Sequence, residues 1–118
     1  KRLSEMDSDD NVSAKVRSIL VEILPGGKSS IEDICNKLGI SKRTLQRKLK
    51  EEDTTFQKQL NHTRELLAKN YLQNTQLSSE DIAYLLGYQD LNSFFRAFSL
   101  WTGTTVTEYK KSLELSHN

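Results

Sequence analysis

The chain repeats part of itself, and this repeat limits how the chain can fold. Residues 30–40, SIEDICNKLGI, return in shortened form as residues 79–88, SEDIAYLLGY. The matched pairs are Asp33 and Asp81, Ile34 and Ile82, Leu38 and Leu86, and Gly39 and Gly87 at an offset of 48, then Leu45 and Phe94, Arg47 and Arg96, and Leu49 and Phe98 at an offset of 49. Each copy has helical spacing on both sides of a glycine. We therefore expect two similar pairs of helices, each pair joined by a glycine turn.

Helical patterns cover most of the chain, and no alternating β-branched segment predicts a strand. We expect helices at about 12–24, 31–38, 42–51, 55–73, 79–86, 91–101 and 105–113. The expected stops are Pro25-Gly26-Gly27, Gly39, Gly87 and Gly103, the expected N-caps are Ser41 and Asp90, and Ser29 with Glu32 and Ser30 with Asp33 both have capping-box spacing. The predicted fold class is all-α, with seven helices that form two helix-turn-helix subdomains joined by a long central helix.

The expected domain organisation follows the repeat. Residues 1–11 are polar, acidic and aperiodic, which is typical of a flexible linker or tail. We expect a first unit at about 12–53, a connecting helix at about 55–73, a second unit at about 75–113 and a tail at 114–118. Because the chain does not begin with Met, we also expect it to be a piece of a longer protein.

Composition limits the classes of protein to which this chain can belong. Hydrophobic residues make up 36% of the 118 residues and charged residues 28%, as in soluble globular proteins. No apolar run approaches the ~20 residues that span a bilayer, so no membrane segment is expected. The single Cys35 excludes an internal disulfide and a cysteine-based zinc site, and we expect it to be a small core residue in a reducing cytosol. His62 has no partner at metal-ligand spacing, and we expect no metal and no cofactor.

Charge is distributed unevenly although the net charge is only +1. Residues 1–10 carry a net charge of −2, which leaves +3 on the rest of the chain. The segment 42–50 contains five Lys and Arg residues and no acid, and Glu51, Glu52 and Asp53 follow it directly. Such a run is compatible either with a solvated helix face or with contact to phosphates.

The predicted helix at 42–51 has two distinct faces. At 100° per residue, Gln46, Arg47 and Lys50 lie within about 60° of Arg43, whereas Leu45 and Leu49 lie near the opposite side. Arg can bind guanine and Gln can bind adenine in the major groove. Three further residues, Lys42, Thr44 and Lys48, flank this face where phosphates would lie. Because a helix-turn-helix places its second helix in the major groove, we interpret this face as a DNA-reading surface rather than a solvated one.

The predicted helix at 91–101 has the same arrangement with less charge. One face carries Phe94, Ala97 and Phe98, and the other carries Asn92, Arg96 and Ser99 with Ser93 and Phe95 at its flanks. Asn92 and Arg96 are expected to read base edges and Ser93 to hold a phosphate. Phe95 either packs on the edge of the core or touches a thymine methyl group. With one basic residue, this second helix is expected to bind more weakly than the first.

These segments resemble the DNA-binding domain of the AraC/XylS family of bacterial transcription regulators. Residues 39–50, GISKRTLQRKLK, are similar to the first recognition helix of the family, and residues 82–105, IAYLLGYQDLNSFFRAFSLWTGTT, to its most specific signature. The resemblance covers about residues 12–113. The chain departs from the family near its end, with Val106 where Pro is usual and Lys110 where Arg is usual. Lys110 keeps the charge but not the bidentate geometry of a phosphate contact.

The resemblance implies how such a domain works. Family members place both recognition helices on one face of double-stranded DNA, in successive major-groove segments, and often bend the DNA. Most carry a separate effector-sensing domain, commonly N-terminal, and the DNA-binding domain also contacts RNA polymerase. The family pattern carries over to Arg43, Gln46, Arg47, Asn92, Ser93 and Arg96, whereas Lys42 and Lys50 come from the helix geometry.

Three classes of function compete at this point. The first is a cytoplasmic transcription regulator that is not an enzyme and whose isolated domain is a monomer, with activation or repression left open. The second is a helical protein-interaction module that contacts RNA polymerase or a sensor domain and has little DNA affinity, which would suit the low net charge. The third, a nucleic-acid enzyme, is disfavoured because the chain has one cysteine and no arrangement of a nucleophile with a base.

Overall fold

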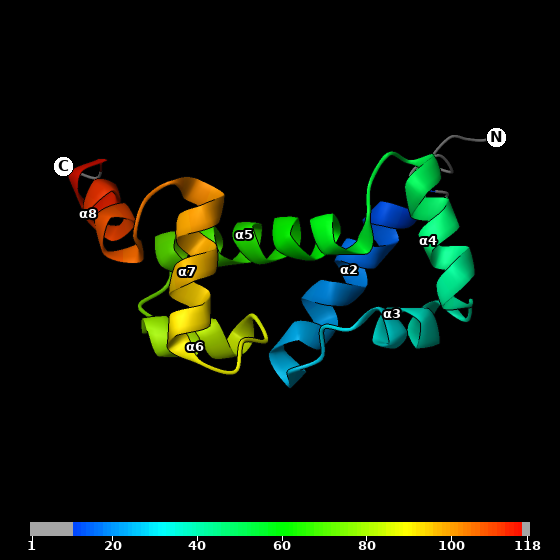
Figure 1. The fold of residues 1–118 in the computed structure, drawn as a ribbon. Coiled ribbons are helices and arrows are strands. Elements are labelled where there is room, and N and C mark those ends of the chain that lie inside the picture. The colour runs from blue at the N-terminus through cyan, green and yellow to red at the C-terminus, as the bar shows by residue number, and fades with distance from the viewer. Residues whose placement is uncertain (1–10, 117–118) are drawn as a thin grey trace. The chain divides into compact units, whose positions relative to one another are not determined.

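The computed structural model describes residues 11–116, and this part of the chain contains seven α-helices, one 3₁₀ turn and no strand (Figure 1). The elements are α2 (Val12–Ile23), η1 (Leu24–Gly26), α3 (Ile31–Leu38), α4 (Lys42–Glu51), α5 (Phe56–Asn74), α6 (Ser79–Leu85), α7 (Leu91–Thr102) and α8 (Val106–Ser116). The predicted all-α fold of seven helices is therefore confirmed. Helix α8 extends three residues beyond its predicted end, and the predicted linker lies almost entirely outside the described residues.

The chain divides into two compact units. Within the described residues, unit 1 comprises 11–24 and 28–63, and unit 2 comprises 25–27 and 64–116. Unit 1 contains α2, α3 and α4, and unit 2 contains α6, α7 and α8. Helix α5 contributes its first part to unit 1 and its remainder to unit 2, so the division falls inside the long helix that the sequence predicted as a connector.

Side-chain caps define the helix-turn-helix of unit 1. Ser30 accepts a hydrogen bond from the backbone N–H of Asp33, and Asp33 accepts one from the N–H of Ser30, which forms the capping box of α3. The pair Ser29 and Glu32 therefore does not provide this cap. Gly39 ends α3 with a left-handed φ of 72°, and Ser41 caps α4 as predicted. Three residues, 39–41, thus separate the two helices.

The repeat is visible in the core of both units. The buried hydrophobic residues of unit 1 are Val16, Leu20, Ile23, Leu24, Ile34, Cys35, Leu45, Leu49 and Leu60. The core of unit 2 comprises Ala68, Leu72, Ile82, Ala83, Leu86, Phe94, Phe98 and Val106. The repeated pairs Ile34 and Ile82, Leu45 and Phe94, and Leu49 and Phe98 are all at most 1% exposed. Each copy therefore buries the same three positions, as the offset predicted.

Aromatic contacts fill out unit 2 around Phe98. Its ring lies 5.4 Å from that of Tyr109 and 6.4 Å from that of Trp101, both in edge-to-face geometry, and 6.0 Å from that of Phe94. Trp101 and Tyr109 thus help to pack α8 against α7. Leu66 of α5 is 54% exposed, because it lies about 200° around the helix from the buried Ala68.

Helix α8 begins without the proline that is usual in the resembled family. Thr105 accepts a hydrogen bond from the N–H of Glu108, and the Glu108 carboxylate accepts hydrogen bonds from the Thr104 hydroxyl (2.8 Å) and the Thr105 N–H (3.2 Å). Val106, the first residue of the helix, is 4% exposed and belongs to the core. A capping box and a buried side chain therefore fix the start of this helix.

Glu52, directly after α4, caps the distant N-terminus of α2. Its two carboxylate oxygens accept hydrogen bonds from the backbone N–H groups of Val12 (2.8 Å) and Ser13 (3.0 Å). Burial disfavours the charged form, but these hydrogen bonds outweigh it and lower the pKa of Glu52. The carboxylate also lies at the positive end of the α2 dipole, so it links the first and last helices of the three-helix part of unit 1.

Arg64 of α5 holds the turn of the second helix-turn-helix. Its side chain is buried, and its Nε donates a 2.8 Å hydrogen bond to the carbonyl of Leu86 at the end of α6, while Nη2 donates a longer one of 3.4 Å to the carbonyl of Gly87. The guanidinium carbon lies 4.2 Å from the centre of the Tyr88 ring. Burial lowers the pKa of Arg64, and the neighbouring Tyr88 works against this shift. The positive charge is thus stabilised by carbonyls and an aromatic face.

We predict that Arg64→Met lowers the free energy of unfolding of unit 2 by about 1–3 kcal/mol, because the Leu86 carbonyl loses its buried donor. Arg64→Lys should recover only part of this loss, since Lys cannot provide the planar fork that reaches both carbonyls. Urea unfolding followed by circular dichroism measures the effect. Lys69→Met is the matched control on the same helix, because Lys69 only forms a partly exposed pair with Glu65. Equal stability of Arg64→Met and the parent protein would contradict the assigned role.

We predict that Glu52→Gln lowers the free energy of unfolding of unit 1 by about 1 kcal/mol at neutral pH, the usual value of a helix cap. Because folding lowers the pKa of Glu52 below its ordinary 4.5, its contribution is present above that value and is lost as the pH falls through the folded pKa. The two proteins should therefore converge in stability in acid. Glu51→Gln controls for loss of charge, and a pH-independent difference between Glu52→Gln and the parent would refute the prediction.

Candidate nucleic-acid interface

Helix α4 presents one continuous polar face to solvent. Lys42, Arg43, Gln46, Arg47 and Lys50 are all exposed. Two leucines on the opposite side of the helix anchor it, since Leu45 is 0% and Leu49 is 1% exposed. Arg43, Gln46, Arg47 and Lys50 therefore share one accessible face, and Lys42 flanks it.

These side chains are available to a ligand. Lys42 forms an ion pair with Glu32, with 3.6 Å between the Lys Nζ and a carboxylate oxygen, and both side chains are more than half exposed. Such surface pairs contribute little and are readily exchanged. The side chains of Arg43, Gln46, Arg47 and Lys50 have no hydrogen-bond or ion-pair partner among residues 11–116. No internal interaction of the described chain would have to break for these four to bind.

On helix α7, some of the side chains that were predicted to contact DNA form hydrogen bonds with one another or with the helix cap. Phe94 and Phe98 are 0% exposed, and Asn92 and Arg96 lie on the exposed side. Asp90 caps the helix by accepting a 2.7 Å hydrogen bond from the Ser93 N–H and a 3.1 Å one from the Ser93 hydroxyl. Arg96 in turn donates to the Ser93 hydroxyl oxygen over 3.5 Å. Ser93 is partly exposed, and its hydroxyl already donates to Asp90 and accepts from Arg96.

The charge of Asp90 bears on the phosphate contact predicted for Ser93. The hydrogen bonds from Ser93 lower the pKa of Asp90, so its carboxylate stays ionised at neutral pH. A negative charge thus stands at the N-terminal end of α7, where a phosphate held by Ser93 would also lie. Repulsion from this carboxylate would oppose a phosphate at the Ser93 hydroxyl, and the phosphate contact of Ser93 stays a prediction.

The two helices can be compared position by position through the offset of 49. Arg43 corresponds to Asn92, Gln46 to Phe95, Arg47 to Arg96 and Lys50 to Ser99. An arginine therefore stands at the same place on both outward faces. At the second position an amide is replaced by a phenyl ring that is 37% exposed and lies 5.9 Å from the Phe94 ring.

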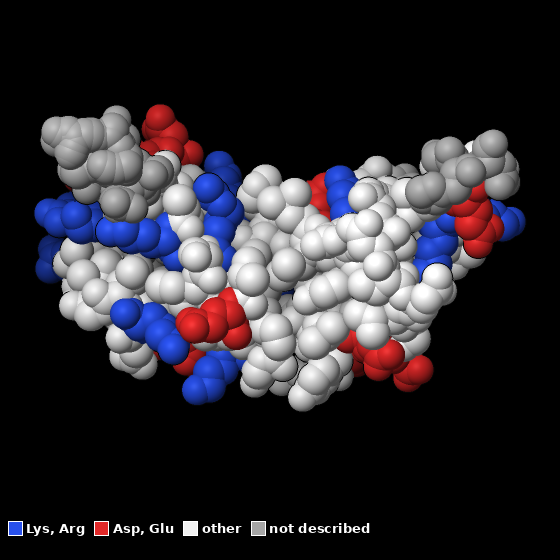
Figure 2. Space-filling model, turned by 180° about the vertical axis from the view of Figure 1, so that it is seen from behind, with Lys and Arg blue, Asp and Glu red and all other residues white. Residues whose placement is uncertain are grey.

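The charges of the two units differ more than the net charge of the chain indicates. Among the described residues, unit 1 contains ten Lys and Arg and six Asp and Glu, a net charge of +4, whereas unit 2 contains five and six, a net charge of −1. Figure 2 shows blue side chains gathered over unit 1, at the left of the view. Long-range attraction of a polyanion therefore falls mainly on unit 1.

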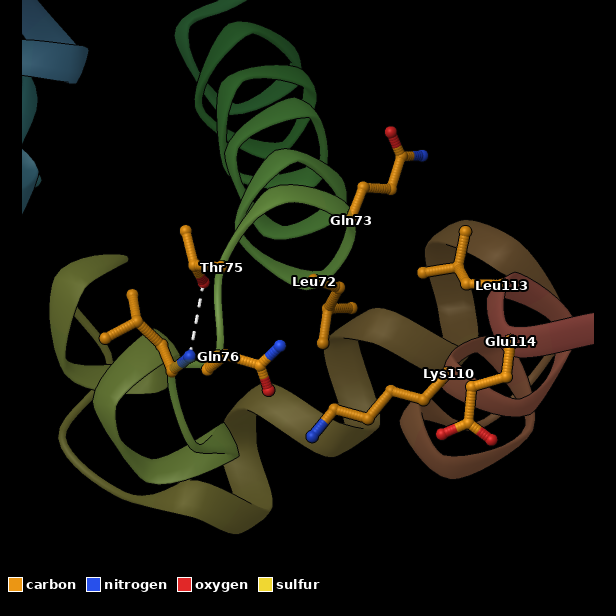
Figure 3. A pocket seen from close by; sticks show the side chains of 8 residues that line it. Leu72, Gln73, Thr75, Gln76, Lys110, Leu113 and Glu114 are labelled. Atoms are coloured by element: carbon orange, nitrogen blue, oxygen red, sulfur yellow. Dashed lines mark hydrogen bonds between the residues drawn. The ribbon is translucent and has the colours of Figure 1, made fainter. Parts of the chain in front are cut away.

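Lys110 lies beside a hollow of about 340 Å³ in unit 2. Figure 3 shows its side chain extending from α8 toward the loop after α5, which carries Thr75 and Gln76, with Leu72 and Leu113 above the hollow. The Leu77 N–H donates a 3.2 Å hydrogen bond to the Thr75 hydroxyl in this loop. Lys110 is half-buried, so it is less free than the exposed lysines of α4 to reach a phosphate.

Two residues that hold the helices of the interface in place, Arg64 and Glu52, were not predicted from the sequence. Arg64 had one signal, because it interrupts the buried series Leu60, Ala68 and Leu72 at a spacing of four residues. No local pattern indicated the role of Glu52, because its partners lie 39 and 40 residues away in the chain.

Cys35 is buried, and desolvation raises its thiol pKa, as expected of a core residue.

The described part of the chain contains neither a metal-binding cluster nor a helix suited to a membrane. Residues 11–116 hold no group of three or more His, Cys, Asp or Glu residues placed to bind a metal ion. None of the helices in this range is both long and apolar enough to cross a bilayer.

Comparison with known proteins supports the interpretation of this chain as a helix-turn-helix domain. Residues 34–112 match the family described as "Helix-turn-helix domain". The ornithine utilization regulator of Pseudomonas aeruginosa is 36% identical over 110 residues, which cover 93% of this chain and 32% of that protein. The chain therefore spans about a third of the length of this curated relative.

Solved structures share the fold. A DNA-binding transcriptional dual regulator from Escherichia coli K-12 superimposes with a TM-score of 0.82 at 24% identity, covering 89% of this chain and 94% of that one. The DNA-binding domain of the global transcriptional factor AdpA, solved in complex with a target DNA, gives a TM-score of 0.76 at 19% identity, covering 90% and 96%.

Fold and family together define a DNA-binding domain of the kind that transcription regulators carry. The chain belongs to the AraC/XylS-type helix-turn-helix family, and the relatives named above are regulators rather than enzymes.

Proposed function

We propose that residues 12–113 bind double-stranded DNA in a sequence-specific manner, with α4 in one major-groove segment and α7 in the next. The observation that carries this proposal is the repeated geometry. Both helices bury two apolar side chains four residues apart and expose an arginine at the same position, Arg47 in one and Arg96 in the other. Two equivalent reading helices in one chain are suited to two short boxes about one helical turn apart.

The side chains of α4 would supply most of the affinity and much of the sequence preference. Arg43 and Arg47 have the length and geometry to bind the O6 and N7 atoms of guanine, and Gln46 to bind N6 and N7 of adenine. Lys42, at the flank of this face, and Lys50, in the last turn of the helix, would bind phosphates. Since unit 1 carries the net positive charge, binding should weaken steeply as salt is added.

The side chains of α7 would read a second box with less electrostatic support. Asn92 is suited to adenine and Arg96 to guanine. The Ser93 hydroxyl would donate to a phosphate only by giving up its hydrogen bond to Asp90, because that bond uses its single donor.

Binding would regulate transcription in the bacterial cytoplasm. The ornithine utilization regulator supports this role through its name and its 36% identity. Because this chain corresponds to 32% of that relative, the intact protein would also carry an effector-sensing domain, with residues 1–11 as the linker to it, and would contact RNA polymerase when bound. Neither proposed role requires an enzymatic activity, a metal or a cofactor.

Docking to a protein partner is a second candidate function. It is favoured by unit 2, which has a net charge of −1 and exposes Leu100 (85%) and Tyr84 (67%). A module of this kind would show weak, sequence-independent binding to duplex DNA even at low salt.

We predict that selection on random duplex DNA enriches two short boxes about one turn apart. On the selected duplex, Arg47→Ala should cost about 1–3 kcal/mol and relax the preference at one base pair, because a base contact is lost. Lys42→Ala is the matched control at the flank of this face. It should weaken all duplexes equally and reduce the salt slope by about 1, because a phosphate contact is lost.

Binding and selection at several salt concentrations distinguish the outcomes. Unchanged affinity and unchanged motif for Arg47→Ala would remove Arg47 from the reading surface. No enrichment, together with weak and flat binding, would favour the protein-docking function instead.

A further inference from the structure

Phe95 is an apolar residue on the outward side of α7. The offset of 49 places it where Gln46 stands on α4, and at 100° per residue it lies about 60° from Asn92 and 40° from Ser99. The ring is 37% exposed. It borders a shallow hollow on the surface of unit 2, together with Arg96, Ser99 and Leu100.

Packing against the core covers only part of the Phe95 side chain. Phe94 and Phe98, at 0% exposure, fill the core side of the helix. Phe95 contacts the Phe94 ring at a centroid distance of 5.9 Å and an interplanar angle of 33°, and 37% of its surface still faces solvent. Leaving a large aromatic surface in water forgoes the free energy that its burial would contribute. A partner that covers this ring would recover that free energy.

The major groove offers one apolar group, the C5-methyl of thymine. Resting on the proposed DNA-binding function, we infer that Phe95 reads a thymine methyl group in the second box, beside the base pair that Asn92 or Arg96 contacts. The Phe94 ring supports Phe95 from behind, so the phenyl group loses little conformational freedom on contact. The equivalent Gln46 would prefer adenine, so the two boxes should differ at this position although the helices repeat.

The test replaces thymine by uracil, which removes only the methyl group. Each thymine of the selected two-box duplex is replaced in turn, and affinity is measured for the unmodified protein. We expect one position in the second box at which the replacement weakens binding about fourfold, the factor expected for burying one methyl-sized group. For Phe95→Ala, the same replacement should have no effect.

Two further variants separate a methyl contact from a general apolar effect. Phe95→Gln copies the residue of the first repeat, and selection with it should shift the preferred base at that position from thymine toward adenine. Leu100→Ala removes another exposed apolar side chain of α7, about 140° around the helix from Phe95, and should retain the full methyl effect.

The possible results distinguish failure of the inference about Phe95 from failure of the proposed DNA-binding function. If the unmodified protein binds two boxes but no thymine in the second box responds to loss of its methyl group, the inference is overturned and the proposed function stands. A response that persists in Phe95→Ala also overturns it, because another residue then makes the contact. If no duplex is bound with sequence preference, the proposed function itself fails.

Discussion

The arrangement of this domain depends on two apolar side chains four residues apart in each reading helix. Leu45 and Leu49 in α4, and Phe94 and Phe98 in α7, are at most 1% exposed. Burial of such a pair fixes the rotation of a helix about its axis, because residues four apart lie on one side of it. The polar side chains opposite the pair are thereby directed outward without further interactions of their own. The glycine turns and serine or aspartate caps then determine where each helix begins.

The two copies share this framework but differ in chemistry. Unit 1 has a net charge of +4 and an outward face on which Arg43, Gln46, Arg47 and Lys50 are exposed and form no side-chain hydrogen bond or ion pair with other described residues, whereas unit 2 has a net charge of −1 and an outward face with an aromatic ring and an arginine that is hydrogen-bonded to Ser93. The first combination is suited to long-range attraction and strong polar contacts. The second is suited to short-range recognition through shape and apolar contact. The two units thus carry outward faces of different chemistry, and the low net charge of the whole chain conceals this difference.

Local signals in the sequence were sufficient to predict most of the fold. The bounds of α3 and α4 agree with those expected from Ser30, Gly39 and Ser41, since caps and glycine turns act within a few residues. The outward faces of both helices also followed from helical periodicity. Long-range interactions were not predictable in the same way: Glu52 caps a helix that begins 40 residues earlier, and Arg64 binds carbonyls 22 and 23 residues later. The engagement of Ser93 by Asp90 and Arg96 also required the structure, because the spacing of these residues allows the contacts but does not require them.

The central claim is that both helices of one molecule read the same duplex. The most direct measurement is the affinity for a selected two-box duplex into which about five base pairs, half a helical turn, are inserted between the boxes. This insertion moves the second box to the opposite face of the DNA while leaving both box sequences intact. The account predicts that affinity falls to that of a duplex with the first box alone. Unchanged affinity after the insertion would contradict it, because the second helix would then contribute nothing that depends on its box.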